Sequence, residues 1–194
     1  MSIKEGKIFV FSAPSGAGKT TILKQVIKDY PNIVFSVSAT TRKKRVDEVD
    51  GREYFFLTEE EFKQRIDNNE FIEWEKFYDY YYGTLKSFVN ENLKKGKYVL
   101  LEVDVIGALN IKKIYPESVL VFIAPPSFEE LISRLKNRKT ESEEDLKKRI
   151  ERAKMELSLK DKFDYFVVNN QLETAISEVK RIIEINYKEN INAT

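Results

Sequence analysis

The fold is decided by a single stretch, KIFVFSAPSGAGKTT at residues 7–21. Its first part, Lys7–Ser12, is an apolar run that ends in small residues, which is typical of a buried strand. After the turn, Thr20–Asp29 carries apolar residues at helical spacing and predicts an amphipathic helix. A glycine-rich turn between a buried strand and a helix is the setting that a phosphate-binding loop requires.

The turn contains the residue types that bind phosphate. Its glycines let backbone amides approach phosphate oxygens, and the helix N-terminus adds the positive end of its dipole. Lys19 is placed to reach a transferred phosphate, and Thr20 offers a hydroxyl to Mg²⁺. The usual pattern begins with Gly where this chain has Ala13, so we expect a negative φ there. The predicted ATP-binding residues of the turn are Ala13, Pro14, Ser15, Gly16, Ala17, Gly18, Lys19, Thr20 and Thr21.

The composition limits the chemistry. The chain of 194 residues has no Cys and no His, which excludes disulfides, thiolate metal sites and imidazole bases. Lys and Arg number 33 against 32 Asp and Glu, which argues against a broad nucleic-acid surface. No apolar run approaches the ~20 residues of a membrane span, and Met1–Lys7 lacks the plan of a signal peptide. We therefore expect a cytoplasmic protein that binds neither nucleic acid nor membrane.

Buried strands alternate with helices along most of the chain. Further strands are predicted at Ile33–Val37, Tyr98–Val103, Val119–Ala124 and Phe166–Val168. A closing amphipathic helix follows from Leu172, and its tail from Asn186 is expected to fray. The alternation predicts a mostly parallel sheet covered on both faces.

The stretch from about Ser36 to Leu93 breaks this rhythm and indicates a small inserted lobe. In it Thr40–Gly51 is predicted to be a loop, Thr58 and Glu61 fit a capping box, and Thr84 is expected to begin a helix. Short aromatic-rich strands are predicted at Tyr54–Leu57, Phe71–Trp74, Lys76–Tyr78 and Tyr80–Tyr82.

Several motifs then follow in a fixed order. They are SVSATTRKKR at Ser36–Arg45, GREYFF at Gly51–Phe56, FIEW at Phe71–Trp74, YYGT at Tyr81–Thr84, LEVD at Leu101–Asp104, IAPPS at Ile123–Ser127 and RLKNR at Arg134–Arg138. Together with the phosphate-binding turn they resemble the guanylate kinase family, one of the P-loop nucleoside monophosphate kinases. The resemblance runs from about Ile8 to Glu184, nearly the whole chain.

The resemblance implies an α/β fold of the P-loop NTPase type, with a three-layer α/β/α core around a parallel sheet. An inserted mixed α+β lobe binds the nucleoside monophosphate (NMP), and a helical lid completes one guanylate kinase-like domain, residues 1–194. On this division the core comprises residues 1–35, 94–126 and 160–194, the NMP-binding lobe 36–93, and the lid 127–159. The lobes are expected to close over both substrates and exclude water.

For the acceptor, the resemblance implies a GMP site. Guanine presents N1–H and its N2 amino group side by side, and one carboxylate accepts hydrogen bonds from both. Glu73 matches this guanine reader, with Ser38 and Thr84 as hydroxyl partners, while arginines and tyrosines bind the phosphate. The implied GMP-binding residues are Ser38, Arg42, Arg45, Tyr54, Glu73, Tyr82, Gly83, Thr84 and Asp104.

For the donor, the resemblance implies that Arg134 stacks on adenine and that Asn169 and Asn170 lie on the adenine side. Arginines of the lid stabilise charge on the transferring phosphoryl group. The implied catalytic residues are Lys19, Arg138 and Arg149. Thr20 and Glu102 are the implied residues of the Mg²⁺ site, although many relatives have Asp where this chain has Glu102.

These features predict a guanylate kinase, which phosphorylates GMP, and dGMP, with ATP and Mg²⁺ in purine nucleotide metabolism and GMP recycling. No general base is needed because the attacking group is an ionised phosphate. One alternative is a kinase for another phosphorylated acceptor, which Glu73 with Ser38 and Thr84 argues against. The other is a non-catalytic protein-binding module, which Lys19 and the lid arginines argue against. We expect a monomer or homodimer whose partners are ATP and GMP.

Overall fold

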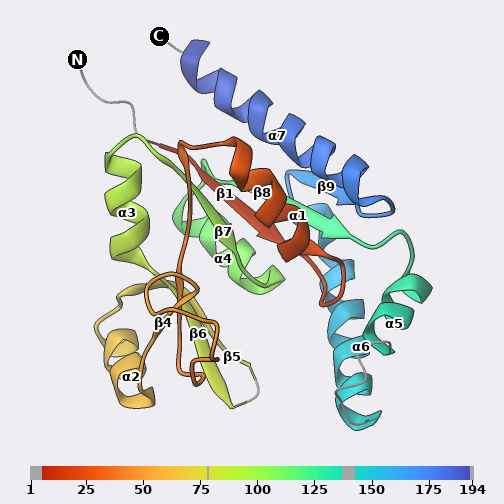
Figure 1. Cartoon of the computed structure of the whole chain (residues 1–194), viewed down its shortest axis with the longest axis horizontal. Coiled ribbons are helices and arrows are strands. Elements are labelled where there is room, and N and C mark those ends of the chain that lie inside the picture. Colours follow the sequence, from red (N-terminus) through yellow and green to blue (C-terminus); the bar gives the residue numbers. More distant parts are fainter. Residues whose placement is uncertain (1–5, 78, 137–142, 193–194) are drawn as a thin grey trace.

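Two β-sheets organise the protein (Figure 1). The computed structural model describes residues 6–77, 79–136 and 143–192. One sheet of five strands forms the centre, and a second sheet of four strands lies beside it. Within these described ranges, no helix combines the length and the apolar character needed to cross a membrane.

The central sheet is built from the apolar runs that the sequence predicts as buried strands. Its order is β2 (Ile33–Phe35), β7 (Tyr98–Glu102), β1 (Ile8–Ser12), β8 (Val119–Ala124) and β9 (Tyr165–Val168), and all neighbours pair in parallel. Every residue of β1 and β8 is buried. Because β1 is the middle strand, the turn that follows it opens at the centre of the sheet's carboxyl edge, where parallel sheets bind ligands.

Helices cover both faces of this sheet (Figure 1). On one face, α1 (Lys19–Val26) and α7 (Leu172–Asn192) bury Leu23 and Val179 in a cluster with Phe9. On the other face, α3 (Lys86–Lys94) and α4 (Val105–Ile114) bury Val89 and Ile111 in a second cluster. The predicted three-layer α/β/α core is confirmed.

The second sheet forms within the predicted insertion. Its order is β4 (Tyr54–Phe56), β3 (Ser38–Thr40), β6 (Tyr80–Leu85) and β5 (Phe71–Phe77). Helix α2 (Glu59–Asp67) begins with the capping box that the sequence predicts, formed by Thr58 and Glu61. From α2 the fully buried Phe62 stacks on Phe71, with ring centroids 4.3 Å apart. This small apolar cluster fixes the sheet against its helix.

Two helices, α5 (Phe128–Lys136) and α6 (Glu143–Ser158), pack on each other beyond β8. Leu131 and Leu135 from α5 form a buried cluster with Ala153 from α6. The two remaining short elements are the 3₁₀ helices η1 (Ile27–Asp29) and η2 (Lys160–Lys162). In Figure 1 the second sheet and the α5–α6 pair extend from the same end of the core, on either side of the turn after β1.

The predicted elements of the insertion need correction. The aromatic stretch forms one hairpin of β5 and β6, because Trp74 to Phe77 pair continuously with Gly83 to Tyr80 and so satisfy their backbone hydrogen bonds in one ladder. Tyr78 lies outside the described residues. Thr84 pairs with Glu73 as part of β6, so α3 begins at Lys86. Thr40, predicted to start a loop, ends β3.

Two helices also differ from the prediction. Helix α4 was not predicted, because VIGALNIKKI is apolar around most of its circumference and shows no clear helical period. Asp104 caps it by accepting a hydrogen bond from Gly107 N at 2.7 Å. Helix α7 continues past Asn186 to Asn192, so the expected fraying is wrong there. The Asn186 side chain donates hydrogen bonds to Tyr165 Oη and Ile182 O, which fixes this part of the helix.

The stacked ring of Phe62 predicts a large effect on stability. Phe62→Ala should lower the free energy of unfolding by about 3–5 kcal/mol, because it removes a fully buried ring and leaves a cavity. Chemical denaturation measures the change. Val46→Ala, at a 99% exposed position of the same insertion, is the control and should change stability by less than about 0.5 kcal/mol. Equal effects of the two variants would contradict the packing described here.

Candidate active site

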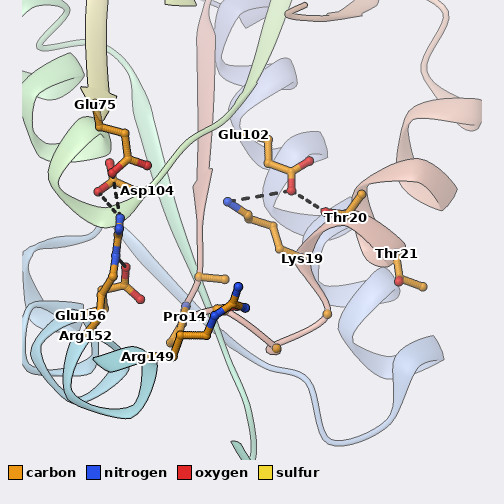
Figure 2. Close-up of a pocket in the computed structure, with 14 residues that line it drawn as sticks. Pro14, Lys19, Thr20, Thr21, Glu75, Glu102, Asp104, Arg149, Arg152 and Glu156 are labelled. Carbon is orange, nitrogen blue, oxygen red and sulfur yellow. Dashed lines mark hydrogen bonds and ion pairs between the residues drawn. The ribbon is translucent and has the colours of Figure 1, made fainter. Parts of the chain in front are cut away.

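A cavity of about 370 Å³ opens at the carboxyl edge of the central sheet, around the turn after β1 (Figure 2). Its walls come from the turn, from the end of β7, from β5 and from α6. The lining residues are Ala13, Pro14, Ser15, Gly16, Gly18, Lys19, Thr20, Thr21, Glu75, Glu102, Asp104, Arg149, Arg152 and Glu156. All the predicted ATP-binding residues of the turn except the buried Ala17 therefore face one space.

The shape of the turn depends on two glycines. Gly16 and Gly18 have φ values of 91° and 89°, in the left-handed region that favours glycine. A Cβ on Gly18 would also collide with the amide nitrogen of Asn169. That nitrogen donates a 2.7 Å hydrogen bond to Ala17 O, so the buried Asn169 supports the turn from the end of β9.

Ala13 has the negative φ that its place in the phosphate-binding turn requires. Asn69 is the one non-glycine residue with positive φ in the described part of the chain, so Ala13 has a negative φ. Its methyl group is buried with the apolar residues of the core. Alanine therefore replaces the usual glycine without backbone strain.

The ammonium of Lys19 lies at the ends of β1 and β7. Its Nζ donates a 2.8 Å hydrogen bond to Val103 O and lies 3.9 Å from Glu102 Oε1. Burial lowers the pKa of Lys19, while the charges of Glu102 and Asp104 oppose that shift. Thr20 Oγ1 donates to the same Glu102 oxygen at 2.5 Å. An ammonium, a hydroxyl and a carboxylate thus meet beside the glycine turn (Figure 2).

Thr20 and Glu102 carry the oxygen atoms that would bind a Mg²⁺ ion or its water ligands. The described residues contain no group of three or more His, Cys, Asp or Glu side chains that could hold a metal ion. Mg²⁺ needs no such group, because it usually keeps several waters and takes one or two carboxylates together with substrate phosphates. The adjacent hydroxyl and carboxylate fit that mode of binding.

Glu73 and Thr84 face each other across the β5–β6 hairpin. Thr84 Oγ1 donates a 2.6 Å hydrogen bond to Glu73 Oε1. Burial raises the pKa of Glu73 to about 7, although the Thr84 hydrogen bond opposes the shift. A Cβ on Gly107 would lie 3.0 Å from Glu73 Oε2 and 2.8 Å from Asp104 Oδ1. The carboxylates of Glu73 and Asp104 therefore converge on the first turn of α4.

Arg42, from the loop after β3, forms a separate group with Tyr54 and Tyr82 of the second sheet. The guanidinium of Arg42 lies 5.4 Å from the ring centre of Tyr54, whose ring lies 6.2 Å from that of Tyr82. Arg42 also forms a 2.7 Å ion pair with Glu48. Ser38 pairs with Tyr54 in the sheet, and the buried Gly83 follows Tyr82. None of this group lines the cavity around Lys19 in the described part of the chain.

Arg45 is not brought into that group. Its side chain is exposed, and its backbone N–H donates to Glu48 Oε2 at 2.8 Å. Glu48 thus accepts hydrogen bonds from both ends of the loop that carries the two arginines.

The predicted lid arginines have different surroundings. Arg149 of α6 lines the cavity, and its Nη1 donates to Ser15 Oγ in the turn at 3.4 Å. Arg134 of α5 donates to Asn169 O at 3.4 Å and pairs with Glu130. Asn170 is exposed beyond β9. Arg138 lies outside the described residues.

The sequence did not indicate three residues that line the cavity, namely Glu75, Arg152 and Glu156. Arg152 Nη2 donates to Glu75 Oε2 at 2.9 Å and to Asp104 Oδ2 at 3.1 Å, and its Nε donates to Glu156 Oε1 at 3.0 Å. Figure 2 shows this guanidinium pointing at the Asp104 and Glu75 carboxylates. Helical spacing could have found part of the group, because Arg152 and Glu156 follow Arg149 by three and seven residues on one face.

Comparisons with known proteins agree on one family. A sequence profile described as Guanylate kinase matches residues 5–186. The guanylate kinase of Thermotoga maritima is 50% identical over 179 residues, 92% of this chain and 86% of the relative. That of Caldanaerobacter subterraneus subsp. tengcongensis is 50% identical over 184 residues, 94% of this chain and 89% of the relative. The crystal structure of guanylate kinase from Anaplasma phagocytophilum is similar with a TM-score of 0.75 and 31% identity, over 94% of this chain and 86% of that one.

The raised pKa of Glu73 predicts that this carboxylate costs stability. An unfolded Glu loses its proton near its ordinary pKa of 4.5, whereas folded Glu73 holds it to about pH 7. Stability should therefore fall as pH rises from about 4.5 to 7, and the cost is fully present above pH 7. Glu73→Gln should be more stable than the wild type at pH 8, by up to about 3 kcal/mol.

Thermal and chemical denaturation of both proteins at pH 5 and pH 8 measure this difference. The advantage of Glu73→Gln should shrink towards pH 5, where Glu73 is protonated in the folded protein. A variant less stable than the wild type at pH 8 would contradict the assignment of Glu73 as a buried, destabilising carboxylate.

Proposed function

The chain belongs to the guanylate kinase family, and we propose how its residues divide the transfer of a phosphoryl group from ATP to GMP. The reaction is the ATP-dependent phosphorylation of GMP to GDP with release of ADP. The position of Lys19 supports this division of roles. Lys19 lies between the glycine turn on one side and the carboxylates of Glu75 on β5 and Glu102 on β7 on the other.

The turn after β1 receives the donor. Its backbone amides and the N-terminus of α1 favour the phosphates of ATP, and Lys19 neutralises charge on the phosphoryl group in transit. Arg149 reaches the same turn from α6 and supplies a second cation to the transferring group. Arg134, Asn169 and Asn170 lie at the end of β9 and serve the adenosine side. We keep Arg138 in the catalytic set with Lys19 and Arg149 on the basis of the sequence alone.

The second sheet receives the acceptor. Glu73 accepts hydrogen bonds from N1–H and the N2 amino group of guanine, with Thr84 bonded to it, Ser38 as the second hydroxyl partner and Asp104 near the nucleoside. Adenine would place an acceptor nitrogen against the carboxylate, so a site of this kind discriminates strongly between the bases. Arg42, Tyr54 and Tyr82 hold the GMP phosphate, with Arg45 adding charge from the loop. Gly83 stays in the predicted GMP site on the basis of the sequence, and a Cβ there would collide with Phe71 and Phe62 of the apolar cluster.

Donor and acceptor sites are close enough to interact electrostatically. The positive charge of Lys19 opposes the rise in the pKa of Glu73. Catalysis then consists of positioning and charge neutralisation, because the GMP phosphate is already an ionised nucleophile. Mg²⁺, held beside Thr20 and Glu102, would supply further neutralisation of the ATP phosphates. The role of these side chains is to present a hydroxyl and a carboxylate at the edge of the turn.

The division into lobes follows from the same assignments. We assign residues 36–93, with the second sheet and α2, to the NMP-binding lobe, and residues 127–159, with α5 and α6, to the lid. The core then comprises 1–35, 94–126 and 160–194. Use of dGMP, a cytoplasmic location, a monomer or homodimer, and the lack of nucleic-acid or membrane partners stay predictions from the sequence.

Both alternative functions are disfavoured. The relatives at 50% identity are named guanylate kinases, not kinases of other acceptors. A non-catalytic module would not need a phosphate-binding turn with Lys19, Thr20 and Arg149 all directed to one cavity.

The role of Lys19 predicts a separation between turnover and GMP binding. Lys19→Met keeps the aliphatic stem and removes the charge, so kcat should fall about 10²–10³-fold. The GMP dissociation constant should change far less than kcat, because Lys19 serves the donor phosphates and acts on Glu73 only through its charge. A coupled assay for ADP and calorimetric titration with GMP measure the two quantities.

Lys24→Met is the matched control, since Lys24 is exposed on the same helix and should leave kcat unchanged. Retained turnover in Lys19→Met, or an equal loss in Lys24→Met, would refute the assigned role.

A further inference from the structure

A single guanidinium joins three parts of the molecule. Arg152 is carried by α6, Glu75 by β5 of the second sheet, and Asp104 by the loop between β7 and α4. Arg152 Nη2 reaches both carboxylates, at 2.9 and 3.1 Å, and Nε holds Glu156 on its own helix at 3.0 Å. The side chains of Arg152 and Glu75 are only about 30% exposed, and that of Glu156 is 6% exposed. Partly buried pairs of this kind are screened by salt less than surface pairs are.

These contacts form a series that connects the proposed GMP site to the proposed ATP site. Strand residues two apart project from the same face, so Glu75 shares a face of β5 with Glu73, the proposed guanine reader. Helix residues three apart lie on one face, so Arg152 shares a face of α6 with Arg149, which reaches the donor turn. The Glu75–Arg152 ion pair connects these two elements directly.

The ion pair also forms part of a wall. Glu75, Asp104 and Arg152 line both the main cavity and a second hollow of about 340 Å³. The other residues that border this hollow are Trp74, Ile106, Gly107, Asn110 and Met155. If the pair were lost, Glu75 and Asp104 would be left with less compensation for their negative charge. Burial and the neighbouring Asp104 already raise the pKa of Glu75, which indicates that charge is crowded at this point.

We propose that Arg152 is a positioning residue which, through Glu75, couples guanine binding on β5 to the placement of Arg149 over the donor phosphates. The proposal rests on the function proposed above. In this role Glu75 and Arg152 act through Glu73 and Arg149, not on the reacting atoms. Their ion pair holds β5 and α6 in one relative position, so that GMP seated against Glu73 favours the arrangement in which Arg149 serves ATP.

The test is a double-mutant cycle on GMP phosphorylation and on ligand coupling. Glu75→Gln, Arg152→Gln and the double variant are compared with the wild type. The readouts are kcat/KM for GMP, and the ratio of GMP dissociation constants measured without and with a non-hydrolysable ATP analogue. We expect each single variant to lose about tenfold in kcat/KM, and the double variant to lose no more than either single variant.

The coupling ratio distinguishes positioning from simple support of the fold. In the wild type the ATP analogue should tighten GMP binding, and in each variant the ratio should move towards one. Glu144→Gln and Lys148→Gln form the control cycle, because this ion pair lies on the same helix at exposed side chains. Both control variants should stay within about twofold of the wild type in kcat/KM.

Arg152→Lys keeps the test informative if Arg152→Gln fails to fold. It keeps the charge but cannot hold three carboxylates with a planar fork, so it should fold normally and still lose part of the coupling ratio. Additive losses in the double variant, or a wild-type coupling ratio of one, would overturn the inference. If the wild type itself failed to phosphorylate GMP, the proposed function would fall first, and the same assay reveals that outcome.

Discussion

Charge has to be balanced at the carboxyl edge of the central sheet, and much of the structure serves that constraint. Among the described residues, four carboxylates and three cations line one cavity there, from Glu75, Glu102, Asp104, Glu156, Lys19, Arg149 and Arg152. Bringing phosphates into such a space is favourable only if the carboxylates are already held by partners. Lys19, Thr20 and Arg152 hold them with hydrogen bonds of 2.5–3.1 Å or with an ion pair to Glu102.

The acceptor side follows the opposite rule, since one carboxylate there is kept poorly compensated. Glu73 has a single hydrogen bond from Thr84 in the described contacts, and burial raises its pKa to about 7. In the proposed function, a guanine base brings the donors that this carboxylate lacks. On that proposal, the cost of burying Glu73 is offset when a ligand with two adjacent donors binds.

The sequence predicts those parts of the fold and site that depend on local pattern. The strand, glycine turn and helix at residues 7–29 follow from apolar runs and glycine positions, and the capping box follows from the three-residue spacing of Thr58 and Glu61. The parallel order of the central sheet is consistent with alternating strands and helices. Helix α4 was missed because apolar residues occur on its exposed side as well as on its buried side, so its period carries little signal.

Features that depend on tertiary contacts could not be predicted in this way. Glu75 and Arg152 are 77 positions apart, and no local pattern indicates that they pair. Asn169 was expected on the adenine side, whereas its amide also supports the backbone of the glycine turn. The side chain of Arg45 is exposed, and where it points depends on loop geometry, which no local sequence pattern indicates.

The most direct measurement is a coupled assay of ADP formation with ATP and Mg²⁺, in which GMP, AMP, dTMP and UMP are offered in parallel. Recognition of guanine by Glu73 with Thr84 predicts turnover with GMP and at least about 10⁴-fold lower kcat/KM with AMP. Comparable turnover with AMP, dTMP or UMP would contradict base recognition by the Glu73 carboxylate while leaving the donor turn intact. A folded protein that turns over none of the four would contradict the account as a whole.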